Sequence, residues 1–188
     1  LTLAFLTLAL PLSAAPLKLT LSTVPGLQFD KPRFTAEPGQ EIELTFKNPD
    51  DMAHNLVFTK PGQRMAVVQA TIALPPDPER IINHPAILTQ TPTLKPNASA
   101  VLKFTAPKAK GIYPYVCTLP GHGLLMYGAM YVGESMPDLA KDDHVPPMAR
   151  AKGANADLHA WPHRRPLMYR IFMPDASPAA IAVALPHG

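Results

Sequence analysis

The stretch that decides most about this chain is Tyr115-Val-Cys-Thr-Leu-Pro-Gly-His-Gly-Leu-Leu-Met126, which sets a thiol, an imidazole and a thioether at the spacing Cys-x4-His-x3-Met. Pro120-Gly121, between Cys117 and His122, predicts a tight turn that brings those two side chains back toward one point. Met126 lies further along the same excursion of the chain. We therefore expect three metal-binding side chains on one loop between two strands.

A fourth candidate ligand lies upstream, His54 in Met52-Ala-His-Asn-Leu-Val-Phe58. It stands at the start of a separate predicted strand, so it would close the site from the side opposite the loop. One thiolate, two imidazoles and one thioether form the ligand set of a blue-copper electron-transfer centre, with a trigonal plane and a weak axial donor. We predict that His54, Cys117, His122 and Met126 bind one type 1 copper ion.

The residues beside these ligands predict how the thiolate is held. Backbone amides and an apolar setting tune the Cys sulfur of such a site, and Asn55 and Leu119 are placed to supply the amides. We also expect the Asn55 side chain to meet Thr118, which would tie the two ligand segments together.

The chain has a single Cys, so it forms no intramolecular disulfide and depends on its core for stability. It opens with an uncharged, largely apolar run to Leu12 and then Ser13-Ala-Ala15, a pattern typical of a secretory signal. The run is shorter than the roughly 20 residues that span a bilayer as a helix. We predict that residues 1–15 are a signal peptide remnant, that there is no transmembrane span, and that the protein is periplasmic or secreted. Metal coordination would shield a lone thiol there from oxidation.

Residues 16–133 alternate short strand-like runs with turn signals, which indicates an all-β sandwich. Apolar and polar residues alternate in 17–22 and in 41–46, so each run has one face for a core and one for water. Residues 61–70 instead predict a short helix, and the Pro-rich segment 74–78 ends it. The helix and this segment together form a helical flap. Further strands are expected at 54–59, 98–105, 111–117 and 127–132.

After Gly133 the composition changes. Residues 134–188 are rich in Pro and carry four of the seven His. We interpret them as an irregular C-terminal extension, a linker leading into the start of a further, truncated module. A tail that packs on the sandwich is the alternative, and the sequence leaves it open.

Charge and motifs exclude several classes of function. The formal net charge is +3, without the basic run or interleaved aromatic residues that indicate nucleic-acid binding. No His-x-His pair occurs to form the additional copper centre of a nitrite reductase or multicopper oxidase. We therefore predict an electron carrier rather than an enzyme. A copper chaperone or storage module, which would bind Cu(I) through the same soft ligands, stays open as the alternative.

Met52-Ala-His-Asn55 and Cys117-Thr-Leu-Pro-Gly-His-Gly-Leu-Leu-Met126 resemble azurin, and more broadly the cupredoxin family. The resemblance spans roughly residues 17–133. It implies a Greek-key β-sandwich with a short helical flap. It also implies that His54, Cys117 and His122 are the equatorial ligands and that Met126 supplies an axial thioether. The carbonyl oxygen of Ala53 would be a distant fifth donor.

The resemblance further implies that electrons pass through His122 at an apolar surface patch, where redox partners such as cytochromes or a reductase or oxidase would dock. Azurins carry a disulfide near the N-terminus, which a single Cys forbids, and they end about where Gly133 falls. The additional residues favour the carrier domain of a larger exported redox protein. The residues expected in the docking patch are Met52, Leu119, Pro120, Leu124 and Leu125.

Overall fold

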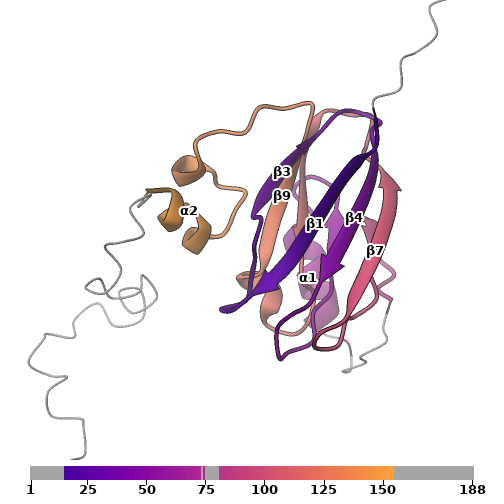
Figure 1. Cartoon of the computed structure of the whole chain (residues 1–188), viewed down its shortest axis with the longest axis vertical. Coiled ribbons are helices and arrows are strands. Elements are labelled where there is room, and N and C mark those ends of the chain that lie inside the picture. Colours follow the sequence, from indigo (N-terminus) through magenta and orange to yellow (C-terminus); the bar gives the residue numbers. More distant parts are fainter. Residues whose placement is uncertain (1–14, 73, 75–80, 155–188) are drawn as a thin grey trace, which may run out of the picture.

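The structure is a computed structural model that describes residues 15–72, 74 and 81–154. Two β-sheets pack face to face (Figure 1), one in the order β2-β1-β4-β7 and the other in the order β3-β9-β8-β5-β6. The predicted β-sandwich is therefore confirmed. The strands of the first sheet are β1 (Leu17–Val24), β2 (Gln28–Phe29), β4 (Glu41–Lys47) and β7 (Ser99–Thr105). The strands of the second are β3 (Arg33–Ala36), β5 (Val57–Thr59), β6 (Ile87–Gln90), β8 (Gly111–Val116) and β9 (Tyr127–Val132).

Alternating apolar and polar side chains explain why the first sheet has one face exposed to solvent. In β4 the apolar side chains Ile42, Leu44 and Phe46 are buried, while Glu41 and Lys47 at its ends are exposed. The same strand pairs with β1 in parallel and with β7 in antiparallel register. One sheet face is thus committed to the core, as the alternation of residues 41–46 predicts.

An aromatic cluster fills the middle of the core and leads up to the predicted metal site. The Tyr115 ring on β8 lies 5.4 Å from the Phe29 ring and 5.4 Å from the Phe58 ring, measured between centroids. Its hydroxyl donates a hydrogen bond to the carbonyl of Lys31. Gly128 makes room for this ring, because a Cβ at that position would lie 2.4 Å from it. Tyr115 therefore holds β8 in place two residues before Cys117.

The outer face of the second sheet is covered by helix α1 (Arg64–Ile72) and by the start of the C-terminal extension. Helix α1 begins three residues later than predicted, because Gly62 at φ 71° forms a turn with Pro61 before it. Val67 and Val68 of the helix pack on the sheet with Val57 and Val116. Residues 73 and 75–80, which include most of the Pro-rich segment 74–78 of the predicted flap, lie outside the described residues.

The first part of the extension lies against β3 and β9, where it forms the 3-10 helix η2 (Leu139–Lys141) and helix α2 (Pro147–Ala154) (Figure 1). Asp142 is fully buried, its carboxylate accepting hydrogen bonds from Arg33 at 3.0 Å and from the Tyr131 hydroxyl at 2.6 Å. Val145 is also fully buried. The described part of the extension, which ends at residue 154, therefore packs on the sandwich through Asp142 and Val145.

Two predictions concern residues outside the described part. These are the signal peptide remnant, of which only Ala15 is described, and residues 155–188, where a further module was predicted to start. Both stay predictions. In the described part of the chain, no helix has the length and apolar character needed to cross a membrane.

Candidate metal centre

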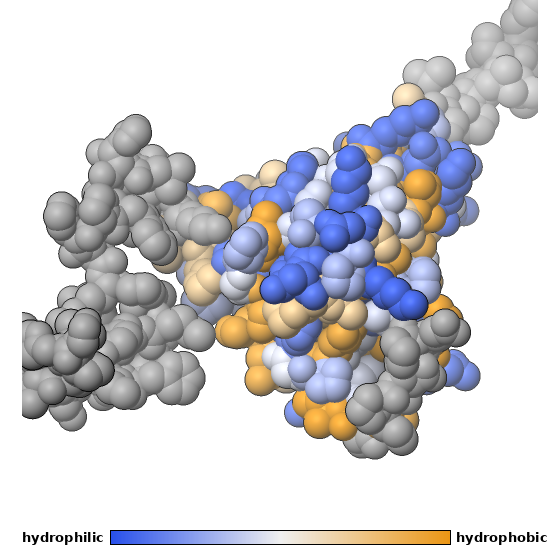
Figure 2. Space-filling view, turned by 60° about the horizontal axis from the view of Figure 1, so that its bottom comes forward, coloured by the Kyte–Doolittle hydropathy of each residue, from blue (hydrophilic) through white to orange (hydrophobic). Residues whose placement is uncertain are grey.

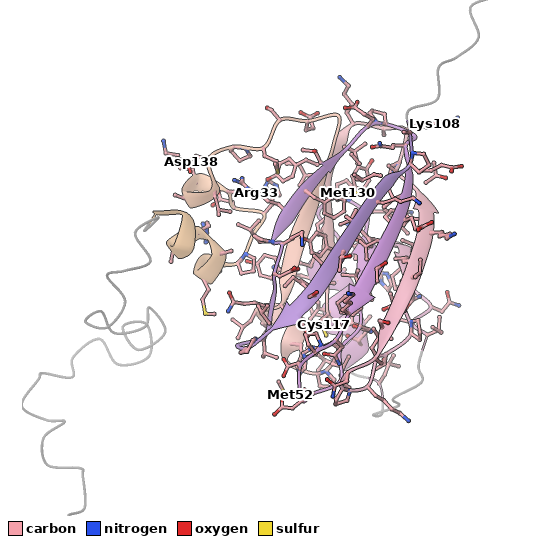
Figure 3. All side chains as sticks on the ribbon, viewed as in Figure 1. Arg33, Met52, Lys108, Cys117, Met130 and Asp138 are labelled. Atoms are coloured by element: carbon pink, nitrogen blue, oxygen red, sulfur yellow. The ribbon has the colours of Figure 1, made fainter. Side chains whose placement is uncertain are left out.

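Three of the predicted ligands meet at one end of the sandwich, the end at which Figure 3 labels Cys117 and Met52. The Cys117 sulfur lies 3.7 Å from Nδ1 of His54 and 3.5 Å from Nδ1 of His122. All three donor atoms lie within 4.8 Å of one another. Bonds of about 2.3 Å to sulfur and about 2.0 Å to nitrogen, opened at about 120°, would put the two donors about 3.7 Å apart. The three side chains therefore fit one metal ion in a trigonal plane.

The loop that carries Cys117, His122 and Met126 is held by its own backbone. Gly121, at φ 81°, starts the short 3-10 helix η1 (His122–Leu124), and the His122 amide donates to the Leu119 carbonyl at 3.0 Å. The Met126 amide then returns to the His122 carbonyl at 2.8 Å, and the Cys117 amide donates to the Met126 carbonyl at 3.0 Å. These bonds close the loop, so the Cys and His side chains point to the same place.

The two weaker donors predicted from the sequence are Met126, on the same loop as Cys117, and Ala53, next to His54 in the sequence. Met126 is fully buried in the same apolar cluster as Cys117. Ala53 is half-buried and directly precedes His54. Their roles as axial ligand and distant carbonyl donor stay predictions.

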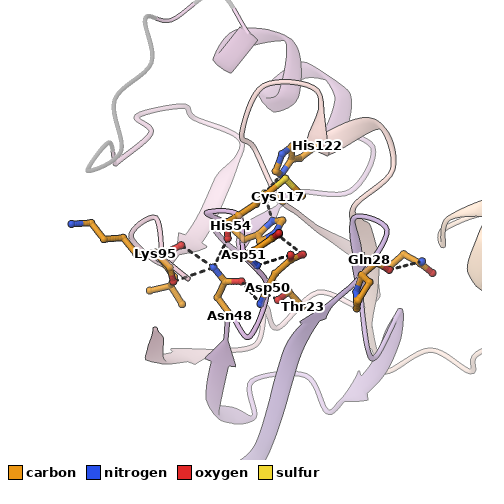
Figure 4. Close-up of polar contacts among 12 residues, drawn as sticks. Thr23, Gln28, Asn48, Asp50, Asp51, His54, Lys95, Cys117 and His122 are labelled. Carbon is orange, nitrogen blue, oxygen red and sulfur yellow. Dashed lines mark hydrogen bonds and ion pairs between the residues drawn. The ribbon is translucent and has the colours of Figure 1, made fainter. Parts of the chain in front are cut away.

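His54 reaches the site from an irregular segment rather than from the predicted strand. Strand β5 begins only at Val57, and His54 forms an isolated bridge with Leu94, with backbone hydrogen bonds of 3.0 and 2.7 Å. On its far side, Nε2 of the imidazole lies 3.2 Å from a carboxylate oxygen of Asp50 (Figure 4). The backbone of His54 is thus fixed by the bridge to Leu94, and its ring is held by the Asp50 carboxylate.

The sulfur of Cys117 lies in an apolar pocket with two amide donors. Burial raises the pKa of the thiol to about 11, although backbone hydrogen bonds from Asn55 and Leu119 act in the opposite direction. The Asn55 side chain also forms two hydrogen bonds with Thr118, both 2.8 Å long. Its nitrogen donates to the Thr118 hydroxyl, and its oxygen accepts from the Thr118 backbone amide. The two segments that carry His54 and Cys117 are therefore joined directly.

Burial also keeps both imidazoles in the form that binds metal. It lowers the pKa of His54, against the opposing effect of Asp50, and it lowers the pKa of His122, where the nearby His54 acts in the same direction. Asp50 behaves differently. Burial tends to raise its pKa, but hydrogen bonds with Asp51 and His54 outweigh this and leave the pKa below its usual value. At neutral pH the site therefore combines neutral imidazoles with an ionised carboxylate behind one of them.

Two residues that support the site were not predicted. Asp50 was missed because acidic residues are common in turns, although its place four residues before His54 is a weak signal. Arg64 of α1 donates to the Gly123 carbonyl at 2.6 Å, and its guanidinium carbon lies 3.8 Å from the centroid of the Tyr127 ring. Nothing in the local sequence around residue 64 indicates contact with a loop 59 positions away.

The residues predicted for the docking patch lie around this end of the molecule. Met52 is 43% exposed and Leu124 is 56% exposed, and Pro120 is also exposed. Leu119 and Leu125 are half-buried. Figure 2 turns this end forward and shows apolar side chains gathered over it beside polar ones. The arrangement provides an apolar surface near His122, which is itself half-buried.

A β-sandwich that gathers one thiol and two imidazoles at one end is the architecture of a mononuclear copper protein. The family model of copper-binding proteins of the plastocyanin/azurin family matches residues 17–133, and the chain belongs to this family. This confirms the resemblance to cupredoxins. The cofactor of the chain is therefore copper, which agrees with the set of one thiol and two imidazoles in the structure.

Individual relatives support the same assignment. Auracyanin-A of Chloroflexus aurantiacus is 37% identical over 112 residues, which make up 56% of this chain and 67% of that protein. The crystal structure of dithionite-reduced auracyanin from Roseiflexus castenholzii has a TM-score of 0.56 and 34% identity, covering 63% of this chain and 98% of the other. The structure of auracyanin A from Chloroflexus aurantiacus, described as a "blue" copper protein, has a TM-score of 0.54 and 31% identity, covering 63% and 99%.

Proposed function

We propose that this chain is a type 1 copper electron carrier, in which His54, Cys117 and His122 bind the metal and Met126 is a weak axial donor. The observation that carries the proposal is the placement of both Nδ1 atoms 3.5 and 3.7 Å from a buried sulfur. The carbonyl oxygen of Ala53 is a further, distant donor in this proposal. Bound copper supplies a one-electron couple between Cu(II) and Cu(I).

The protein around the donors is suited to electron transfer because it holds them before any metal arrives. His54 is fixed by its bridge to Leu94, and Cys117 is fixed by the backbone bond to Met126. Donors locked by hydrogen bonds and packing stay in one geometry when the charge at the centre changes. Little rearrangement is then needed between the two oxidation states.

His122 is the exit for electrons in this proposal, because it is the one donor residue of the three that is not fully buried. Met52, Pro120 and Leu124 provide exposed apolar surface at the same end. An apolar patch of this kind suits a transient redox partner, such as a cytochrome or a reductase or oxidase, that excludes water from the contact. The rest of the proposed patch is Leu119 and Leu125.

Visible and paramagnetic-resonance spectra of the copper-loaded protein test the proposal. An electron carrier of this type gives an intense thiolate-to-copper absorption band and a reversible one-electron reduction. Cys117→Ser should abolish the band and leave the circular dichroism of the sandwich unchanged. A colourless protein that exchanges Cu(I) readily with a chelator would instead indicate a chaperone or storage module.

We further propose that the chain is exported to the periplasm or beyond and serves as the carrier domain of a larger redox protein. The support is the apolar run to Leu12 followed by Ser13-Ala-Ala15, together with the residues after Gly133 that the family model does not match. Fractionation of cells that express the complete reading frame tests export, and the mass of the product tests whether the chain is part of a larger protein. A copper-loaded product that remains in the cytoplasm would contradict export.

A further inference from the structure

The imidazole of His54 has a carboxylate behind it, on the side away from the sulfur. One Asp50 oxygen lies 3.2 Å from Nε2 of His54, while Nδ1 of the same ring lies 3.7 Å from the Cys117 sulfur. The Asp50 side chain is 10% exposed and the His54 side chain is 0% exposed. Figure 4 shows the three side chains in a row, carboxylate, imidazole and thiol.

This arrangement selects one form of the neutral imidazole. An ionised carboxylate only accepts hydrogen bonds, so Nε2 of His54 must carry the proton. The lone pair of the ring then lies on Nδ1, the atom that faces Cys117. Without an acceptor at Nε2, the proton would be free to move to Nδ1 and block the metal side of the ring.

Asp50 itself is held in position by the turn in which it lies. Its other oxygen accepts the Asp51 amide at 2.8 Å, and its own amide donates to the side-chain oxygen of Asn48 at 3.3 Å. Asn48 is buried and its side-chain nitrogen donates to the Met52 carbonyl at 2.8 Å, which closes the turn. The carboxylate is therefore part of a fixed network rather than a mobile surface group.

The charge of Asp50 is directed at His54. Among the residues that the structure describes, no lysine or arginine forms an ion pair with Asp50, and one of its carboxylate oxygens faces the neutral imidazole of His54 instead. A carboxylate hydrogen-bonded to a ligating imidazole orients the ring and makes it a stronger donor. A stronger donor stabilises the more highly charged metal ion more than the less charged one.

We infer that Asp50 is a positioning residue of the copper site, which holds His54 in the Nε2-protonated form and, by strengthening it as a donor, stabilises Cu(II) relative to Cu(I). The inference rests on the proposed function for its effect on copper. Its effect on the imidazole does not require copper and is measured without it.

The first test is the tautomer of His54 in the metal-free protein, read from long-range ¹H–¹⁵N correlations of the imidazole nitrogens at neutral pH. The wild-type protein should show His54 only in the Nε2-protonated form, and Asp50→Ala should show a mixture of both forms. An Nδ1-protonated His54 in the wild-type protein would overturn the inference without any variant. This measurement decides the inference even if the protein proves not to be an electron carrier.

The second test is the reduction potential of the copper-loaded protein, with Asp51→Asn as the matched control. Asp51 is exposed and close enough for its charge to act on His54, but it is Asp50 that accepts the hydrogen bond from Nε2. Asp50→Asn should lower the Cu(II) affinity about tenfold more than the Cu(I) affinity, which raises the potential by about 59 mV. Asp51→Asn should change it by much less. Equal shifts in both variants would show a general charge effect and overturn the positioning role.

Discussion

Helix α1 packs closely on the predicted copper loop at Gly123, and Gly123→Ala tests that contact. A Cβ on Gly123 would lie 2.5 Å from Cγ2 of Val68 and 3.0 Å from both its Cγ1 and the Cys117 carbonyl oxygen. Such distances require the helix or the loop to move, and inserting a methyl group into a packed core costs about 1–3 kcal/mol. Because Gly123 follows His122 directly, the displaced loop should also weaken the visible copper band.

Val68→Ala provides the second arm of a double-mutant cycle, because it removes both methyl groups that would clash. Val68 is 1% exposed, so this change alone should cost about 2 kcal/mol through lost burial and the cavity that remains. The new methyl group of Gly123→Ala would then occupy part of that cavity. We expect the double variant to be about 1–2 kcal/mol more stable than the sum of the single changes predicts.

Urea unfolding of the metal-free protein measures the four free energies, and the visible band of the copper-loaded forms reports on the loop. Val68→Ala alone serves as the control for a cavity without a clash. The double variant should recover most of the band that Gly123→Ala loses. Additive destabilisation to within about 0.5 kcal/mol would refute the proposed contact between helix and loop.

Three further predictions use other parts of the structure. Met126→Leu should keep the absorption band and raise the reduction potential, because a weak donor that favours Cu(II) is lost; failure to bind copper would show that Met126 is more than an axial ligand. The apparent copper affinity should rise about tenfold per pH unit between about pH 6 and pH 9, because the Cys117 thiol, with a pKa of about 11, must release its proton; pH-independent binding by calorimetry would contradict this. Asp142→Asn should cost about 3 kcal/mol at pH 7 by leaving Arg33 without its buried partner. Burial tends to raise the pKa of Asp142, but hydrogen bonds from Tyr131 and Arg33 hold it below the usual value. The stabilisation in the wild-type protein should therefore persist above about pH 4 and disappear as the pH falls through that lower pKa. An equally steep loss of stability in acid for the variant, measured by unfolding, would refute the assignment.

The long strands were predictable from local patterns, and three short ones, β2, β3 and β6, were not. The alternation over residues 41–46 corresponds to β4, and the run 127–132 has the same bounds as β9. Strands β2 and β3 are only two and four residues long, so they carry too few residues to show a period. Such strands form because neighbouring strands offer hydrogen-bond partners, as β9 does for β3.

The start of β5 was predicted too early, at His54, for a related reason. The residues from His54 to Thr59 read as one β-like run, but pairing with the neighbouring strands β6 and β8 begins only at Val57. His54 instead bridges to Leu94, 40 positions along the chain, and this contact turns its side chain toward Cys117. Local propensity does not distinguish these two forms of extended backbone.

The chemistry of the candidate site was readable from residue types and spacing, because a thiol, two imidazoles and a thioether are properties of residues and the turn at Pro120-Gly121 is local. Tertiary structure alone decided which groups stand behind those donors. Asp50 faces the imidazole through a turn that Asn48 closes, Arg64 reaches the copper loop from a helix, and the extension is held by an ion pair between residues 109 positions apart. Contacts of this kind depend on which faces the folded chain brings together, and residue type and spacing do not encode them one by one.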